Sequence, residues 1–150
     1  MTTLLDRLAA ARKANDLSRL GEAIPYARWM SMAPENTTGE LLTRMRYHQT
    51  LVGNTHLPAL HGGTIGALLE TAAIFHLLWE MDNAALPRII NITVDYLRSG
   101  RPVDTLARAN FTKLGRRVAS VAVEAWQDDR SRPIASANAH FLISPREQEE

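Results

Sequence analysis

The fold of this chain is decided by the stretch Leu60-His61-Gly62-Gly63-Thr64-Ile65-Gly66-Ala67-Leu68-Leu69-Glu70. Its two adjacent glycines mark a turn, after which apolar residues recur with the period of a helix. The helical pattern continues to about Met81, and Asp82, Asn83 and Pro87 end it. We therefore predict one long apolar helix in the middle of the chain.

The sequence before this helix predicts a second helix and one strand. Residues 2–20 follow an amphipathic helical pattern that Gly21 is expected to end, and residues 21–40 are expected to be irregular. Over residues 41–52 apolar and polar side chains alternate, as in a half-buried strand. Residues 53–60 are expected to form the loop that leads into the long helix.

After the long helix the sequence predicts four strands in a meander. They are expected near residues 90–96, 107–111, 118–126 and 134–143, with turn sequences between them. The absence of alternating strands and helices argues against a parallel sheet. We predict an α+β domain in which an antiparallel sheet wraps around the long helix.

Composition limits the classes of function. The chain has 150 residues, 17 Lys+Arg, 16 Asp+Glu and no Cys, which is one domain's worth of chain. The lack of Cys excludes disulfides, thiolate metal sites and cysteine nucleophiles, and a net charge of +1 argues against a nucleic-acid partner. The N-terminal stretch is interrupted by charges, unlike a signal peptide, and the apolar stretch 64–81 also contains charged residues. We expect a cytoplasmic protein without a membrane partner.

One carboxylate does not fit a plain apolar core. Glu70 lies in the middle of the long helix, on a face that it shares with Gly66, Ala67, Ala73, Ile74 and Leu77. Burying a carboxylate is costly unless it is paired or protonated. Glu70 is therefore either a structural residue that reaches solvent or an arginine, or a functional acid, and the residues alone leave both interpretations open.

The two glycines before this carboxylate suggest a second functional feature. Unpaired backbone N–H groups gather at the start of a helix, where the helix dipole also favours negative charge. Gly62 and Gly63 would let a ligand approach this backbone closely, although a plain tight turn has the same sequence. A carbonyl oxygen held by Gly63, together with a carboxylate base or nucleophile, is the equipment that thioester hydrolysis requires.

The stretch 60–70 resembles the hotdog-fold thioesterases of the phenylacetate-pathway type. Their signature is His-Gly-Gly, then a helix, then an acidic residue nine positions after the histidine, which matches His61 and Glu70. The segments 94–99 and 113–117 also resemble that family, and the similarity covers about residues 40–144. The resemblance implies a hotdog domain over residues 41–144, preceded by an N-terminal helical extension (1–40) and followed by a charged tail (145–150).

The resemblance also implies acyl-CoA hydrolysis in a homodimer or homotetramer, with each active site between two subunits. By position, Glu70 is the base or nucleophile, and the Gly63 N–H polarises the thioester carbonyl from the other subunit. His61 orders the loop, and Asn54 lies near a family asparagine that holds the substrate carbonyl or water. Many members carry Asp at the acid position, so Glu70 reaches one methylene further.

Because CoA carries phosphates, basic groups are expected at the mouth of the pocket. The candidates for substrate or CoA binding are Gly62, Arg98, Ser99, Lys113, Gly115, Arg116 and Arg117. The same charges could serve as solvated residues that keep edge strands from pairing.

Two further functions stay open. His56 lies 14 residues before Glu70, which resembles the acid–base pair of hotdog β-hydroxyacyl dehydratases, although Thr64 and Ile65 replace the Pro-Gly of that family. The chain could also be a non-catalytic acyl-CoA-binding module. The sequence offers no nucleophile elbow, no P-loop and no convincing metal ligands, so we expect neither a metal nor a cofactor.

Overall fold

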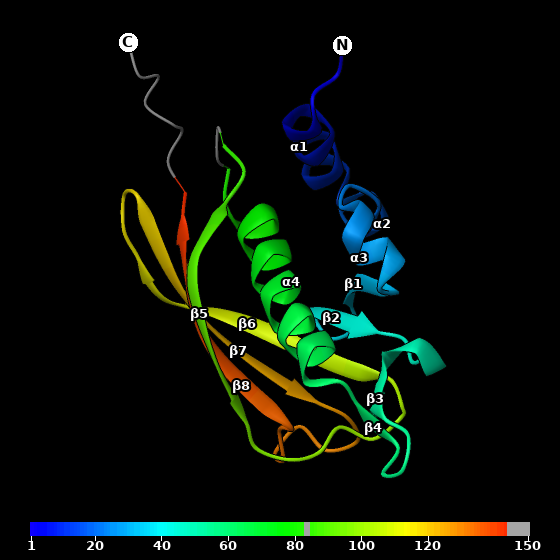
Figure 1. Ribbon diagram of the computed structural model, residues 1–150. Coiled ribbons are helices and arrows are strands. Elements are labelled where there is room, and N and C mark those ends of the chain that lie inside the picture. Colours follow the sequence, from blue (N-terminus) through cyan, green and yellow to red (C-terminus); the bar gives the residue numbers. More distant parts are fainter. Residues whose placement is uncertain (83–84, 144–150) are drawn as a thin grey trace.

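The computed structural model describes residues 1–82 and 85–143, so the predicted tail at 145–150 lies outside the described residues. The helices are α1 (Leu4–Ala14), α2 (Leu17–Glu22), α3 (Pro25–Trp29), the 3₁₀ turn η1 (Gln49–Leu51) and α4 (Gly62–Glu80). The strands are β1 (Met32–Asn36), β2 (Leu41–Met45), β3 (Val52–Asn54), β4 (Ala59–Leu60), β5 (Arg88–Tyr96), β6 (Thr105–Leu114), β7 (Val118–Trp126) and β8 (Ala135–Leu142). The predicted α+β architecture is confirmed: a sheet curls around the long helix α4 (Figure 1).

The main sheet has six antiparallel strands in the order β1-β2-β6-β7-β8-β5. The prediction of a four-strand meander is correct for β6, β7 and β8 but wrong for β5. The chain leaves β5, crosses the sheet through residues 97–104 and enters at β6, while β5 pairs with β8. A meander pattern in the sequence shows that strands follow one another, and it does not show which strand each one pairs with. As a result, β5 is an edge strand of this sheet.

The strand register defines two ends of the sheet. Tyr96 pairs with Ala135, and Ala135 pairs with Ala125, so these residues form a row across β5, β8 and β7 at one end. Arg88 and Val118 both pair with Leu142, which forms a row at the opposite end. We call the first the Tyr96 end and the second the Arg88 end.

Helix α4 begins at the Tyr96 end of the sheet. The Leu60 N–H donates to the Gly100 carbonyl at 2.9 Å, which ties the start of α4 to the crossing segment. The buried side of α4 packs on a sheet face made largely of alanine and valine, with Ala107, Val121, Val123 and Ala137 at its centre. These short side chains let the helix lie close to the strands. Length and composition alone would also allow α4 to cross a membrane, but half of that window is buried within the chain.

The N-terminal region differs from the prediction in three places. The expected helix over residues 2–20 is two helices, because Asn15 has φ 52° and takes the left-handed conformation that ends α1. Gly21 does not end a helix but lies buried within α2, where an added Cβ would come within 2.9 Å of Pro34. The segment expected to be irregular contains α3 and the edge strand β1, so the helical part of the extension ends at Trp29.

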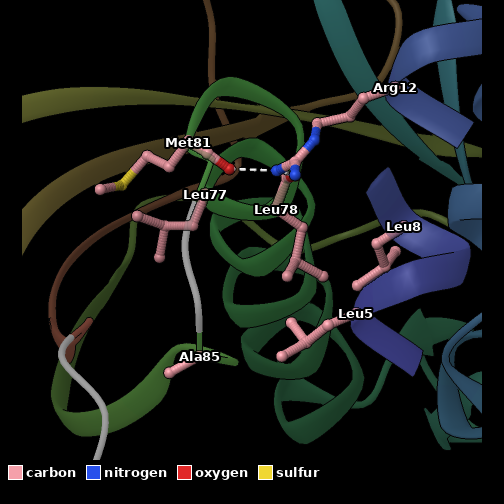
Figure 2. Close-up of a pocket in the computed structure, with 7 residues that line it drawn as sticks. All are labelled: Leu5, Leu8, Arg12, Leu77, Leu78, Met81 and Ala85. Carbon is pink, nitrogen blue, oxygen red and sulfur yellow. Dashed lines mark hydrogen bonds between the residues drawn. The ribbon is translucent and has the colours of Figure 1, made fainter. Parts of the chain in front are cut away.

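Helix α1 is held against the C-terminal end of α4. Leu5 and Leu8 lie beside Leu78, and the Arg12 guanidinium points at the last carbonyls of α4 (Figure 2). Arg12 donates to the Leu78 carbonyl at 3.1 Å, to the Met81 carbonyl and to Asp82 Oδ1 at 2.6 Å. Arg12 therefore supplies donors to carbonyls that a helix end leaves unsatisfied.

The segment between the extension and α4 is more regular than predicted. The strand expected over residues 41–52 ends at Met45, after which η1 turns the chain into β3. The loop expected at residues 53–60 is mostly the β3–β4 hairpin. Apolar and polar residues go on alternating beyond Met45, although the strand ends there. The pattern continues because exposed polar residues in the turn after β2 keep the spacing of a strand.

Candidate active site at the start of helix α4

The first turn of α4 is fixed by His61. Its Nδ1 accepts the Gly63 N–H at 2.8 Å, and its backbone carbonyl accepts the Thr64 hydroxyl at 2.7 Å. Because Nδ1 is an acceptor here, the neutral ring carries its proton on Nε2. On the other side the ring packs on Gly53, where an added Cβ would come within 2.9 Å of the imidazole. His61 thus acts as the N-cap of α4, and a side-chain cap of this kind stabilises the start of a helix by about 1 kcal/mol.

The two glycine amides are not equivalent. The Gly63 N–H, expected to bind a substrate carbonyl, already donates to His61 within its own chain. A carbonyl oxygen at this amide must therefore share the N–H with the imidazole or replace it. The Gly62 N–H has no acceptor in the described part of the chain and precedes the first intrahelical hydrogen bond. The start of α4 therefore offers two amides to an anion, of which the Gly62 amide is the less engaged.

Tyr96 is a site residue that the sequence did not single out. Its hydroxyl donates to the Gly62 carbonyl at 2.8 Å, and its ring lies over the first turn of α4. An added Cβ would meet this ring at 3.3 Å from Gly62 and the hydroxyl at 3.4 Å from Gly66. The small residues at 62 and 66 thus make room for the tyrosine. In the sequence, Tyr96 lies within the segment 94–99, which resembles the thioesterase family but gives no sign of a contact with Gly62.

Glu70 lies two turns further along α4. Its side chain is half-buried, as are Gly66, Ala67 and Ile74 on the same stripe of the helix, whereas Ala73 is fully buried. No arginine pairs with Glu70, and no hydrogen bond to it is found, within residues 1–82 and 85–143. The interpretation of Glu70 as half of a structural ion pair therefore has no support in the described chain. Its carboxylate is available to a ligand or to a second copy of this protein.

Asn54 stabilises a turn. Its Oδ1 accepts the backbone N–H groups of His56 at 3.0 Å and of Leu57 at 3.2 Å, which closes the tip of the β3–β4 hairpin. The oxygen expected to help hold a substrate or water is thus engaged, whereas the amide nitrogen makes no hydrogen bond to the described residues. His56 is exposed on this hairpin.

The remaining histidine on α4 belongs to the packing between helix and sheet. The His76 ring lies 4.7 Å from the Phe111 ring, centroid to centroid. Burial lowers the pKa of His76, while Glu80 acts to raise it and Arg108 to lower it. His76 is therefore neutral near pH 7 and lies apart from the Glu70 stripe. Across the described ranges, no group of three His, Cys, Asp or Glu side chains is placed to hold a metal ion.

An open pocket adjoins the start of α4. It is lined by Ala59, Leu60, Gly62, Ile65 and the segment from Tyr96 to Gly100, which contributes Arg98 and Ser99. The structure thus brings together part of the predicted set: Gly62, Arg98 and Ser99 lie at the Tyr96 end of the sheet. An apolar wall with a few polar groups is the usual composition of a ligand site.

The other predicted basic residues lie elsewhere. Lys113 lies near the end of β6, and Gly115, Arg116 and Arg117 form the β6–β7 turn, which is at the Arg88 end of the sheet (Figure 1). Val118 and Ala125 lie near the two ends of β7, and at roughly 3.3 Å per residue they are about 23 Å apart. Within a single chain, Arg98 and the basic residues at 113–117 therefore do not meet at the mouth of one pocket, contrary to the expectation. Sequence proximity misleads here because β6 runs the whole length of the sheet between Arg98 and Lys113.

Gly115 itself has a structural role in that turn. Its N–H donates to the Val118 carbonyl at 2.9 Å, and an added Cβ would come within 3.0 Å of the same oxygen.

Comparison with known proteins agrees with this fold. The model of the thioesterase superfamily matches residues 57–134. A Chromobacterium violaceum protein of known structure is 42% identical, with 94% of this chain and 98% of that chain covered and a TM-score of 0.75. No match is found among curated proteins.

Two more distant structures show the same fold. One is a phenylacetic acid degradation-related protein from Ralstonia eutropha, proposed to be a thioesterase; it is 18% identical over 91% of this chain and 99% of that one, with a TM-score of 0.74. The other is a Bacillus halodurans protein solved with CoA, 16% identical over 96% of this chain and 90% of that one, with a TM-score of 0.71. With its six-stranded antiparallel sheet around one long helix, this chain has the hotdog fold and belongs to the thioesterase superfamily.

Proposed function

We propose that this protein is an acyl-CoA thioesterase in which Glu70 is the catalytic carboxylate. The observation that carries the proposal is the position of Glu70: a half-buried carboxylate without a partner in the described chain, on the helix whose capped start presents amides to an anion. Superfamily membership and the CoA in the Bacillus halodurans structure support the thioester chemistry and the CoA group.

The reaction needs one acceptor of a proton and one stabiliser of negative charge. As a base, Glu70 takes a proton from a water molecule whose oxygen adds to the thioester carbonyl carbon. The amides at the start of α4 stabilise the resulting oxyanion. When the tetrahedral intermediate collapses, the C–S bond breaks, the acid is released, and the CoA thiolate takes up the proton. As a nucleophile, Glu70 would instead attack the thioester carbonyl carbon and displace the CoA thiolate, which leaves a mixed anhydride. Water then hydrolyses this anhydride to the free acid and the regenerated Glu70 carboxylate.

One α4 helix cannot supply both parts of the site. Gly63 and Glu70 are seven residues apart, which is about 10 Å along a helix axis at 1.5 Å per residue. A thioester carbonyl held by the amide of Gly63 is therefore too far from Glu70 of the same helix. We propose that the site combines the helix start of one subunit with Glu70 of another, in a homodimer or a dimer of dimers.

The edge strand β5 supports this assembly. It ends the sheet and exposes large apolar side chains, with Ile90 and Tyr96 each 55% exposed, and Leu97 directly after the strand is 50% exposed. Two β5 strands that pair about a twofold axis would extend the sheet and bring the Glu70 stripes of both subunits toward each other.

The test is turnover of a panel of CoA thioesters by Glu70→Gln, with release of free CoA thiol as the readout. We expect a loss of turnover of at least 100-fold with CoA binding retained, since the amide has the same shape but cannot accept a proton. His56→Ala is the matched control: a thioesterase should keep most of its activity, whereas a dehydratase that uses His56 and Glu70 would lose nearly all of it. Unchanged turnover in Glu70→Gln would remove Glu70 from the mechanism.

The same panel separates an enzyme from a binding module. If the wild-type protein binds acyl-CoA and releases no thiol from any thioester, the proposed activity is wrong and the protein is a carrier of acyl-CoA. The hydrolysed member of the panel also identifies the acyl group.

A further inference from the structure

We propose that Arg98, Arg101 and Arg132 form the site for the phosphates of the CoA nucleotide, which makes free CoA thioesters the substrate class of this protein. The inference rests on the proposed function, whose site lies next to these residues. Arg101 and Arg132 lie 31 residues apart in the sequence, so only the fold brings them together.

The arginines line one pocket at the Tyr96 end of the sheet. Its walls come from the segment after β5 and from the β7–β8 turn: Arg98, Ser99, Arg101, Gln127, Asp128, Asp129, Arg132 and Ile134. Both segments lie at the lower end of the molecule in Figure 1, below the start of α4. This arginine pocket shares Arg98 and Ser99 with the pocket that contains Gly62 and Tyr96.

The shared residues give a path for an extended ligand. A thioester held by the amides of α4 would run its pantetheine arm past Tyr96 and Ser99, and the nucleotide would reach the arginines. The basic β6–β7 turn lies at the Arg88 end of its own subunit, so it does not adjoin this path within one chain.

The two segments that carry the arginines are braced against each other. Gln127 Nε2 donates to the Arg101 carbonyl at 2.8 Å, and Gln127 Oε1 accepts the Arg101 N–H at 3.1 Å. Arg98 Nη1 donates to the Pro133 carbonyl at 2.6 Å. The arginines are therefore carried by a backbone that is already held in place, which lowers the entropic cost of binding.

The charges of the pocket favour an anion, although carboxylates are also present. Asp128 pairs with Arg101, and Asp129 is held by the Ser131 N–H at 2.9 Å and hydroxyl at 2.7 Å. These hydrogen bonds, followed by Arg132 and Arg98, lower the pKa of Asp129. Three guanidinium groups against two carboxylates leave a net charge of +1.

Arg132 is the most available of the three. Its guanidinium makes no hydrogen bond to the described part of the chain and is therefore free to bind a phosphate in a bidentate manner. Arg101 can release the exposed Asp128 and bind a phosphate in its place, because a surface ion pair contributes little free energy.

The experiment compares the binding of CoA, 3′-dephospho-CoA and pantetheine by calorimetry, using the full-length protein. We expect Arg132→Ala and the double variant Arg101→Ala/Arg132→Ala to weaken CoA binding by about tenfold or more, and to leave pantetheine binding within twofold of wild type. Arg19→Ala, an exposed arginine on α2 away from this pocket, is the control for a change of charge alone. Arg132→Ala removes no internal hydrogen bond, so its effect does not depend on refolding of the pocket.

Two outcomes would overturn the inference: wild-type protein that binds CoA no better than pantetheine, or a larger loss in a Lys113→Ala/Arg116→Ala/Arg117→Ala variant than in the Arg101/Arg132 variant. Either result leaves the proposed hydrolysis intact if CoA thioesters are turned over. Conversely, CoA binding that depends on Arg132 without any turnover would support the phosphate site and reject the proposed activity.

Discussion

At the scale of single residues, Tyr96 connects the edge strand to the start of α4. Its hydroxyl donates to the Gly62 carbonyl, and its ring occupies the space that glycines at 62 and 66 leave open. A displacement of this turn would move the amides that we propose to stabilise the oxyanion. Tyr96 is in this sense a positioning residue, because it acts through the backbone of another residue.

We therefore expect Tyr96→Phe to lower kcat by about two- to tenfold with little change in KM, since one hydrogen bond of about 0.5–1.5 kcal/mol is lost. The measurement is steady-state hydrolysis of the best CoA thioester. Tyr26→Phe, on the exposed surface of α3, is the control and should leave both constants unchanged. A rise in KM at constant kcat would instead assign Tyr96 to substrate binding.

At the scale of elements, Arg12 links α1 to α4 across 66 residues of sequence. It donates to the Leu78 and Met81 carbonyls and pairs with Asp82, so that it caps the C-terminal end of α4 (Figure 2). A cation at this end is also favoured by the helix dipole. The N-terminal extension thus contributes to the stability of the helix that carries Glu70.

We expect Arg12→Ala to lower the free energy of unfolding by about 1–3 kcal/mol, because charge-assisted hydrogen bonds are lost and carbonyls are left without a donor. Urea denaturation measures this loss, and hydrogen exchange should show faster opening of the last turn of α4 than of its first. Lys13→Ala is the neighbouring control and should change stability by less than about 0.5 kcal/mol. Equal losses in the two variants would mean that the contact in Figure 2 adds nothing to stability.

At the scale of the whole molecule, the active site that we propose combines residues of two chains. Gly63 and Glu70 lie too far apart on one helix, and β5 has an open edge with exposed Ile90 and Tyr96. Complementation between inactive variants tests this arrangement directly, because a site shared between chains can be rebuilt from two different defects.

We predict that Glu70→Gln and Gly63→Ala are each inactive alone and that an equimolar mixture, unfolded and refolded together, regains about a quarter of wild-type activity. Half of the dimers are then mixed, and each mixed dimer has one intact site. Turnover and light scattering are the measurements. A mixture that stays inactive while forming mixed dimers would place both groups of one site in the same chain.

The residues around His61 show how much of the site was predictable. The spacing from His61 to Glu70 depends only on local order, and the structure has the helix start at the predicted place, with Glu70 half-buried on that helix. Local pattern did not show that the Gly63 amide is already bonded to His61 or that Asn54 closes a hairpin, because these bonds depend on side-chain direction. Tyr96 was missed because its contact with Gly62 joins residues 34 positions apart.

The sequence by itself determined the long apolar helix, its glycine start, the strand-rich second half and the fold class, because hydrophobic periodicity and turn residues act over short distances. Only the tertiary structure decided that β5 forms the edge, that β1 joins the sheet, and that Arg98 lies with Arg101 and Arg132 and not with Lys113. The physical reason is strand pairing: a strand carries its two ends about 20 Å apart, so neighbours in sequence separate and distant segments meet.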